Sequence, residues 1–255
     1  MNIQGKTAVV TGGASGLGRA TVESIIAKGG NVAIFDLNDE AGSALAAELG
    51  ERAFYQRVNV ADESNVRTAI EAVVAKFGAI HICVNCAGIG IAKKTLPREG
   101  EHSFDEFNRI IQVNLCGTFN VLRLAAQQMA KNDPDEGGER GVIVNTASVA
   151  AFDGQMGQAA YSASKGGVVG MTLPIARDLS ANAIRVNTIA PGLINTPLFN
   201  SLPDEAINAL VSMIQSPKRL GNPSEYAQLA THIVENSYLN GETIRLDGAI
   251  RMQAR

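Results

Sequence analysis

Short apolar runs alternate with segments of helical pattern along all 255 residues of the chain. The apolar runs, which predict strands, cover 6–11, 31–35, 53–60, 81–84, 141–145, 184–189 and 243–246. The helical patterns cover 19–28, 40–49, 62–77, 104–131, 160–181 and 225–235. Most of these strands are continuously apolar, which is typical of a parallel sheet that helices cover on both faces. The order of elements therefore predicts an α/β fold with a doubly wound, mostly parallel sheet of seven strands.

No linker or internal repeat divides this pattern, so we expect one domain spanning residues 1–255. Apolar residues make up 45% of the chain, and the formal net charge is −3, which offers no basic field for nucleic acid. No apolar run approaches the roughly 18 residues of a membrane span. Three cysteines, an odd number, predict no disulfide framework and therefore a reducing, cytoplasmic compartment. The first predicted strand starts at residue 6, which leaves no room for a signal or transit peptide.

Gly12, Gly16 and Gly18 lie between the first predicted strand and the first predicted helix. Glycine permits a tight turn and a close backbone approach to a pyrophosphate, which then lies at the helix N-terminus. Such a turn alone is equally compatible with an ordinary strand-to-helix connection. Asp36 ends the second predicted strand, where an acidic side chain can bind the ribose hydroxyls of a dinucleotide. Together these features predict a nicotinamide-dinucleotide site.

The residues around this ribose position favour NAD over NADP. The carboxylate of Asp36 would repel the 2′-phosphate of NADP. Ala14, Ser15 and Leu37 provide no arginine or lysine to hold that phosphate. We therefore expect NAD to be the cofactor.

A second group of polar residues comprises Ser148, Tyr161 and Lys165. If the segment from Tyr161 is helical, Tyr161 and Lys165 stand one turn apart on the same face. Free tyrosine has a pKa near ~10, and a neighbouring positive charge favours the phenolate. A serine hydroxyl delivered by the preceding turn could share a substrate oxygen with the phenol. The group therefore suits proton transfer to or from an alcohol.

These residues together resemble the short-chain dehydrogenase/reductase family, and the resemblance spans essentially the whole chain. Its motifs occur in order as Thr11-Gly12-x-x-x-Gly16-x-Gly18, Asn85-Cys86-Ala87-Gly88, Asn114, Ser148, Tyr161-x-x-x-Lys165 and Pro191-Gly192. The resemblance implies a single-domain Rossmann fold. Longer stretches, among them RGVIVNTASVAAFDGQ, GQAAYSASKGG and NGETIRLDGAIRMQ, are similar to a subgroup of 3-hydroxyacyl-CoA dehydrogenases that is also known for acting on hydroxysteroids.

The resemblance implies a role for each matching polar residue. Tyr161 would be the general acid/base that exchanges the proton on the substrate oxygen. Lys165 would lower the pKa of that phenol and hold the nicotinamide ribose. Ser148 would hydrogen-bond the substrate oxygen, and Asn114 would keep a water in a relay that ends at Lys165. The cofactor carries out the hydride transfer. The side chains therefore transfer the proton, orient the reactants and supply the electrostatic environment.

The resemblance also implies a path for the dinucleotide along the chain. Beside Gly12, Gly16, Gly18, Asp36, Tyr161 and Lys165, its residues would be Ser15, Leu17, Asn59, Val60, Cys86, Ala87, Gly88, Pro191, Gly192, Ile194 and Thr196. Two positions depart from the usual family motif. Asn59 replaces an aspartate that accepts a hydrogen bond from the adenine amine, and its amide oxygen can still accept. Cys86 replaces the second asparagine of an Asn-Asn-Ala-Gly motif.

The substrate remains open between two classes. A 3-hydroxyacyl-CoA thioester is favoured by the subgroup resemblance and by Gln155, which would face the substrate from the loop after Ser148. A hydroxysteroid or another secondary alcohol would use the same catalytic residues. A third possibility is a binding or scaffold protein that retains the fold, but the four catalytic positions are intact.

Two polar segments, 92–103 and 132–140, interrupt the alternation, and we expect both at the surface. The first carries Lys93, Lys94 and Arg98, which could meet the phosphates of CoA or simply be solvated. Gly166, Gly167 and Gly170 follow Lys165 on its predicted helix and suggest close helix packing. The family's tetramers pack this helix across a subunit interface, so we expect a homotetramer.

No metal site is expected. Cys83 and Cys86 spell C-x-x-C, but residues three apart in a strand point to opposite faces, so the two sulfurs should not converge. The three histidines, His81, His102 and His232, are scattered along the sequence without clustered partners. Buried thiols and structural or solvated histidines are the better interpretation.

Overall fold

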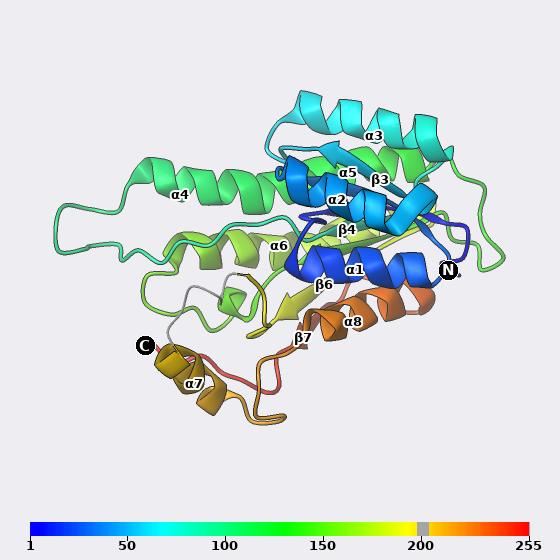
Figure 1. Cartoon of the computed structure of the whole chain (residues 1–255). Helices are drawn as coiled ribbons and strands as arrows, with labels where there is room; N and C mark the ends of the chain where they lie inside the picture. Colours follow the sequence, from blue (N-terminus) through cyan, green and yellow to red (C-terminus); the bar gives the residue numbers. More distant parts are fainter. Residues whose placement is uncertain (198–203, 255) are drawn as a thin grey trace.

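The computed structural model describes residues 1–197 and 204–254 and contains one parallel sheet of seven strands in the order β3-β2-β1-β4-β5-β6-β7 (Figure 1). The strands are β1 (Thr7–Thr11), β2 (Asn31–Asp36), β3 (Ala53–Arg57), β4 (Ile82–Asn85), β5 (Gly141–Thr146), β6 (Ile184–Pro191) and β7 (Thr243–Leu246). All six strand pairings are parallel. The predicted doubly wound α/β fold is therefore confirmed.

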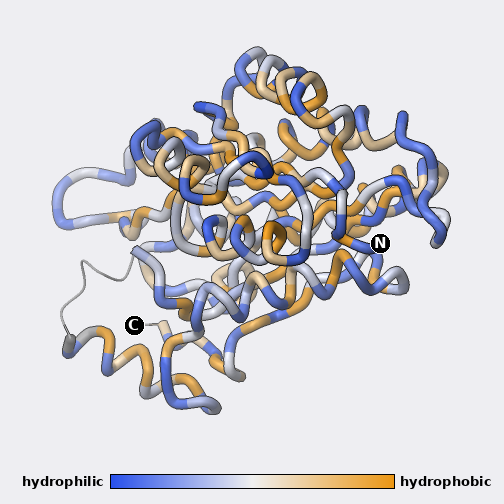
Figure 2. The backbone as a smooth tube through the Cα atoms, turned by 45° about the vertical axis from the view of Figure 1, so that its right-hand side comes forward, coloured by the Kyte–Doolittle hydropathy of each residue, from blue (hydrophilic) through white to orange (hydrophobic). Residues whose placement is uncertain are grey.

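Helices cover both faces of the sheet (Figure 1). They are α1 (Gly16–Ala27), α2 (Asp39–Leu49), α3 (Glu63–Phe77), α4 (Phe104–Ile111), α5 (Gly117–Met129), α6 (Ala159–Asp178), α7 (Asp204–Met213) and α8 (Pro223–Glu235). Helices α3, α5 and α6 pack on one face, and α1, α2 and α8 pack on the other. Figure 2 shows hydrophobic residues concentrated in this layered interior and hydrophilic residues along the outer turns. None of the described helices is long and apolar enough to cross a bilayer.

The predicted helix 104–131 is wrong in its middle. Between α4 and α5, residues Gln112–Cys116 form one turn of π-helix, in which Asn114 is fully buried. The Thr118 hydroxyl donates to the Asn114 carbonyl at 2.8 Å, and the Asn114 side chain bonds to the backbone of Ile89. Single π-helical turns inside α-helices often mark functional sites. The periodicity of apolar residues predicts a helix but does not reveal a single π-helical turn within it.

Two other expectations differ from the structure. The third strand ends at Arg57, not at residue 60, although Val58 and Val60 are buried. In the polar segment 132–140, Glu139 is only 7% exposed because its carboxylate pairs with Arg185 and the Met1 amine. The other polar segment, 92–103, protrudes between β4 and α4 at the left of Figure 1 and is hydrophilic at its tip in Figure 2.

The strand order reverses between β1 and β4. The chain builds β1, β2 and β3 outward to one edge, then crosses back to place β4 on the other side of β1. In an open parallel sheet, such a switch point leaves a crevice outside the carboxyl ends of the strands, and ligands bind there. The first glycine-rich turn follows β1 at this point, so the fold itself places the predicted dinucleotide residues at the crevice.

Candidate active site

A cavity of about 640 Å³ opens at the carboxyl ends of the strands. Its lining includes every residue expected to bind the dinucleotide: Gly12, Ser15, Gly16, Leu17, Gly18, Asp36, Asn59, Val60, Cys86, Ala87, Gly88, Tyr161, Lys165, Pro191, Gly192, Ile194 and Thr196. Ser148 also lines it. Residues from six strand ends and from helices α1, α4 and α6 thus meet in one space large enough for a dinucleotide and a small substrate group.

The glycine-rich turn leaves no room for side chains. Gly12 has a φ of +62°, and an added Cβ would lie 3.0 Å from the Ala87 backbone. An added Cβ at Gly18 would lie 2.1 Å from the Gly12 carbonyl oxygen. Helix α1 begins at Gly16, and its N-cap Ser15 makes no side-chain capping bond within the described part of the chain. Free backbone N–H groups at this helix terminus suit a pyrophosphate. The turn therefore fits a dinucleotide.

Asp36 lies at the end of β2 and lines the cavity. One carboxylate oxygen accepts from the Ala14 N–H at 3.0 Å, and the other accepts from the Asn38 N–H at 3.1 Å. The carboxylate therefore holds both the glycine-rich turn, through Ala14, and the turn that follows β2, through Asn38. Each oxygen keeps further accepting capacity for a ribose hydroxyl.

Tyr161 stands in the first turn of α6, and the Ser148 hydroxyl hydrogen-bonds to its phenol. Burial raises the pKa of Tyr161 above its ordinary value, and the bond to Ser148 lowers that pKa in part. Ser148 is itself held by the Ala150 N–H, which donates to its hydroxyl at 3.1 Å. The resemblance implied that Lys165 lowers the pKa of Tyr161. The ammonium lies 5.8 Å from the ring centroid, and burial and Ser148, not Lys165, are the causes that shift this pKa.

The Lys165 ammonium lies on the buried side of this pair, and the residue is 4% exposed. It donates to the Thr146 carbonyl at 2.8 Å, and burial lowers its pKa to about 8. The Thr146 hydroxyl in turn lies 2.6 Å from the hydroxyl of the fully buried Tyr226 on α8. The Cys86 thiol lies 3.6 Å from the same Tyr226 hydroxyl. A polar cluster from distant parts of the chain thus holds the lysine in place.

Asn114 does not line the cavity but lies directly behind it. Its side-chain oxygen accepts from the Ile89 N–H at 2.8 Å, and its amide donates to the Ile89 carbonyl at 2.8 Å. The amide also donates to the Ser164 hydroxyl at 3.1 Å. An added Cβ at Gly88 would lie 3.3 Å from the Asn114 oxygen and 3.4 Å from the Lys165 nitrogen. Asn114 and Lys165 are therefore neighbours on either side of Gly88.

The structure does not bring Gln155 to the cavity. The Gln155 amide instead donates to the carbonyl of Gln253 at 3.2 Å, in the C-terminal segment.

Asn59 lines the cavity, and its side-chain oxygen accepts from the Ala61 N–H at 3.1 Å. Lining residues that were not predicted are Phe35, Leu37, Val58, Ile89, Gly90, Arg109, Val113, Thr146, Ala147 and Pro197. Most are adjacent to predicted residues in sequence, so the motifs themselves pointed to them.

The loop lysine and the cysteines have contacts of their own. Lys93, which was considered as a contact to CoA phosphates, forms an ion pair with Glu106 of α4 at 2.6 Å. Cys83 packs in the core on the α3, α5 and α6 side of the sheet, whereas Cys86 contacts the core on the α1, α2 and α8 side. All three cysteines are free thiols. The described residues contain no cluster of three side chains suited to hold a metal.

The glycines of α6 differ in their surroundings. An added Cβ at Gly167 would lie 2.7 Å from the Leu115 side chain, so this glycine permits close packing against the π-helical turn. Added Cβ atoms at Gly166 and Gly170 would meet nothing within 4 Å. Leu173 on the same helix is 44% exposed.

Comparisons with known proteins agree with this geometry. A family model described as short chain dehydrogenase matches residues 6–206. Human 3-hydroxyacyl-CoA dehydrogenase type-2 is 55% identical over 254 residues, which is 99% of this chain and 97% of the human protein. The Drosophila melanogaster protein of the same name is 53% identical over 98% of this chain and 99% of its own. The crystal structure of 3-hydroxyacyl-CoA dehydrogenase type-2 from Mycobacterium avium matches with a TM-score of 0.95 at 46% identity, covering 98% of each chain. The chain therefore belongs to the short chain dehydrogenase family, a family of oxidoreductase enzymes that use NAD or NADP.

Proposed function

We propose that this enzyme reversibly oxidises a 3-hydroxyacyl-CoA to the 3-ketoacyl-CoA with NAD. The observation that carries the chemistry is the meeting of Ser148, Tyr161 and Lys165 in the same cavity as the glycine-rich turn. The thioester class is supported by the names of relatives that match nearly the whole chain. A scaffold role has no comparable support, because each proposed catalytic side chain is present and held by specific contacts.

Each side chain has a distinct task in this proposal. A bound nicotinamide ring supplies the hydride acceptor. Tyr161 takes the hydroxyl proton of the substrate during oxidation and returns it during reduction. Ser148 hydrogen-bonds the substrate oxygen, so that this oxygen lies beside the phenol. Lys165 holds the nicotinamide ribose, and Asn114 orders the water that links Lys165 to solvent.

The preference for NAD rests on the ribose end of the cavity. The Asp36 carboxylate lines the cavity and is held in place by two backbone hydrogen bonds, from the N–H groups of Ala14 and Asn38. A 2′-phosphate at this position would face that negative charge. Ala14 and Ser15 provide no cation to compensate for the repulsion.

The proposed function predicts turnover of a short 3-hydroxyacyl-CoA with NAD, measured as NADH formation. We expect kcat/KM to be higher with NAD than with NADP, and higher with 3-hydroxybutyryl-CoA than with a hydroxysteroid. A higher kcat/KM with the hydroxysteroid than with the thioester would show that the substrate is a steroid, while the proposed reaction chemistry would still hold. If the protein binds NAD but turns over neither class, the enzymatic proposal itself fails.

The pH dependence of the reaction should follow the protonation of Tyr161. Oxidation requires the phenolate, and burial raises the pKa of this phenol. We therefore expect kcat/KM for oxidation to rise with pH, by up to about tenfold per unit on the steep limb. Reduction requires the protonated phenol and should fall as the pH approaches the same pKa.

Replacing Ser148 provides the matched test of this assignment. The Ser148 hydroxyl lowers the pKa of Tyr161, so Ser148→Ala should move the rising limb of oxidation to higher pH. The measurement is a kcat/KM profile for both proteins in both directions. A profile that stays level across the neutral and alkaline range would show that another group exchanges the proton.

We also propose a homotetramer in a reducing, cytoplasmic compartment. The outer face of α6, open at Gly166 and Gly170 and apolar at Leu173, supports the packing of this helix against another subunit. The three free thiols support the compartment. Sedimentation velocity distinguishes a tetramer from a dimer or a monomer.

A further inference from the structure

Arg57 ends β3 next to Asp36, which ends β2. The two residues are register partners on the adjacent parallel strands β2 and β3. Side chains of such partners project from the same face of the sheet. Asp36 lines the cavity and Arg57 does not, so Arg57 is the strand neighbour of the residue at the proposed ribose position.

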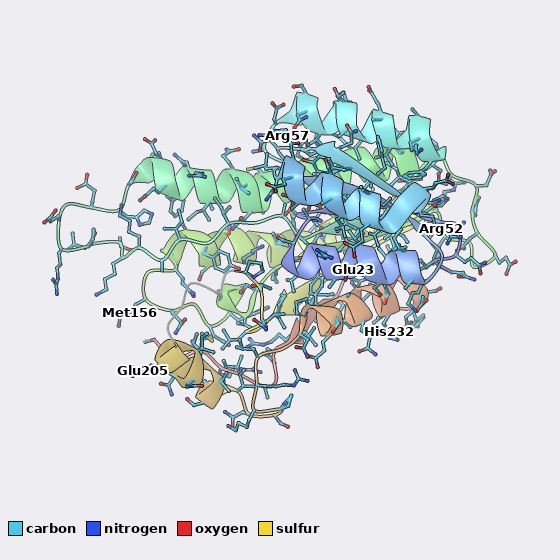
Figure 3. All side chains as sticks on the ribbon, viewed as in Figure 1. Glu23, Arg52, Arg57, Met156, Glu205 and His232 are labelled. Carbon is cyan, nitrogen blue, oxygen red and sulfur yellow. The ribbon has the colours of Figure 1, made fainter. Side chains whose placement is uncertain are left out.

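The guanidinium is held by a second carboxylate. Arg57 forms an ion pair with one oxygen of Asp39, in the first turn of α2, and the Tyr55 hydroxyl donates to the other oxygen at 2.8 Å. The same hydroxyl lies 3.2 Å from the Asp36 carbonyl oxygen. Figure 3 shows Arg57 beside the start of α2, where β3 ends. The Asp39 carboxylate therefore lies close behind the turn that carries Asp36.

The pair is open to solvent, with 61% of the Arg57 side chain and 58% of the Asp39 side chain exposed. An exposed ion pair is weak and readily exchanges partners. A phosphate monoester is a better partner for a guanidinium than a single solvated carboxylate, because it carries a charge of about −1.5 to −2 and three strong acceptor oxygens. What Arg57 binds is therefore decided by which anions compete for it.

We propose that Asp39 is a cofactor-specificity residue. By pairing with Arg57, Asp39 prevents the guanidinium from binding a 2′-phosphate at the ribose end of the cavity. The inference rests on the proposed preference for NAD. Asp36 repels the phosphate directly. Asp39 acts through Arg57, by neutralising the cation and by adding a second negative charge. The ligand class excluded is adenosine carrying a 2′-phosphate.

The test measures binding, so that it does not depend on turnover. Calorimetry gives the Kd of adenosine 5′-monophosphate and of adenosine 2′,5′-bisphosphate, which differ only in the 2′-phosphate. Wild-type protein should prefer the monophosphate, and Asp36→Ser should reduce that preference. Adding Asp39→Asn to Asp36→Ser should strengthen binding of the bisphosphate by a further factor of about ten, with little change for the monophosphate.

Two controls separate Arg57 from a general change in charge. Adding Arg57→Met to the double variant should remove the tenfold gain, because the phosphate then loses its cation. Glu40 is the matched acid, since it lies in the same turn of α2 and makes no ion pair within the described residues. Asp36→Ser with Glu40→Gln removes the same charge and should leave bisphosphate binding as in Asp36→Ser alone.

The outcomes are distinct. Equal gains from Asp39→Asn and Glu40→Gln, or a gain that survives Arg57→Met, would overturn the role of Asp39. A wild-type protein that binds both nucleotides equally would instead overturn the proposed NAD preference. Thermal unfolding of each variant shows whether Asp39→Asn keeps α2 intact, and Asp39→Glu, which restores the carboxylate, should reverse the gain.

Discussion

Replacing Tyr161 by phenylalanine should reduce kcat for both directions by at least about a hundredfold, while NAD binds as in the wild type. The substitution removes one hydroxyl and keeps the ring, so the packing of α6 is preserved. Lys165 remains held by the Thr146 carbonyl, which does not depend on the phenol. Only the group that exchanges the substrate proton is lost. Stopped-flow and steady-state rates with a 3-hydroxyacyl-CoA measure the loss, and calorimetry measures NAD binding.

Tyr238 provides the matched control for this substitution. It is 99% exposed, so Tyr238→Phe makes the same chemical change far from any buried contact and should leave kcat unchanged. Retention of more than about a tenth of the wild-type kcat in Tyr161→Phe would contradict the assignment of Tyr161 as general acid/base. The remaining rate would then have to come from another group within reach of the substrate oxygen.

The dinucleotide end of the site could be predicted from sequence because its constraints are local. Gly12 and Gly18 are required by backbone contacts within one turn, and Asp36 ends the very next strand. The alternation of strands and helices fixes where these elements meet, since parallel strands bring their carboxyl ends to one edge. A local motif on a predictable fold thus positions every expected cofactor residue in the cavity.

Long-range contacts account for what the sequence could not reveal. The Tyr226 hydroxyl reaches Thr146 beneath Lys165 only because α8 folds back across the sheet, 80 positions away in sequence. The π-helical turn at Asn114 depends on Ile89, in the loop after β4, and on Ser164 of α6. The pKa of Tyr161 depends on burial, which no single segment determines. Such features follow from packing and cannot be inferred from spacing.

Polarity alone misled two expectations. Glu139 lies in a polar segment that was expected at the surface, yet Arg185 gives its carboxylate a buried partner. Gln155 follows Ser148 and was expected to face the substrate, yet its amide donates to the Gln253 carbonyl in the C-terminal segment. In both cases a partner far away in sequence decides where the side chain lies. A polar residue's position therefore cannot be assigned without its partner.

Replacing Gly18 by alanine should weaken NAD binding by about tenfold or more, the second large effect that the structure predicts. An added Cβ would lie 2.1 Å from the carbonyl oxygen of Gly12, 2.6 Å from its carbonyl carbon and 2.9 Å from the Cα of Gly13. All three atoms belong to the backbone, so no side-chain rotation can relieve the overlap. The turn must move away from the helix, and the N–H groups of the phosphate site move with it.

Gly166 is the control that isolates this effect from helix propensity. It lies within α6, and an added Cβ there would meet nothing within 4 Å. Gly166→Ala should therefore leave NAD binding unchanged, because no atom of its own subunit obstructs the added Cβ. Helix propensity favours alanine by up to about 1 kcal/mol, and packing of α6 against another subunit in the proposed tetramer would oppose that gain. Calorimetry with NAD and thermal unfolding of both variants make the comparison. The overlap with Gly12 forces the glycine-rich turn to move in Gly18→Ala. If this variant binds NAD with wild-type affinity, the dinucleotide phosphates must therefore bind away from the turn.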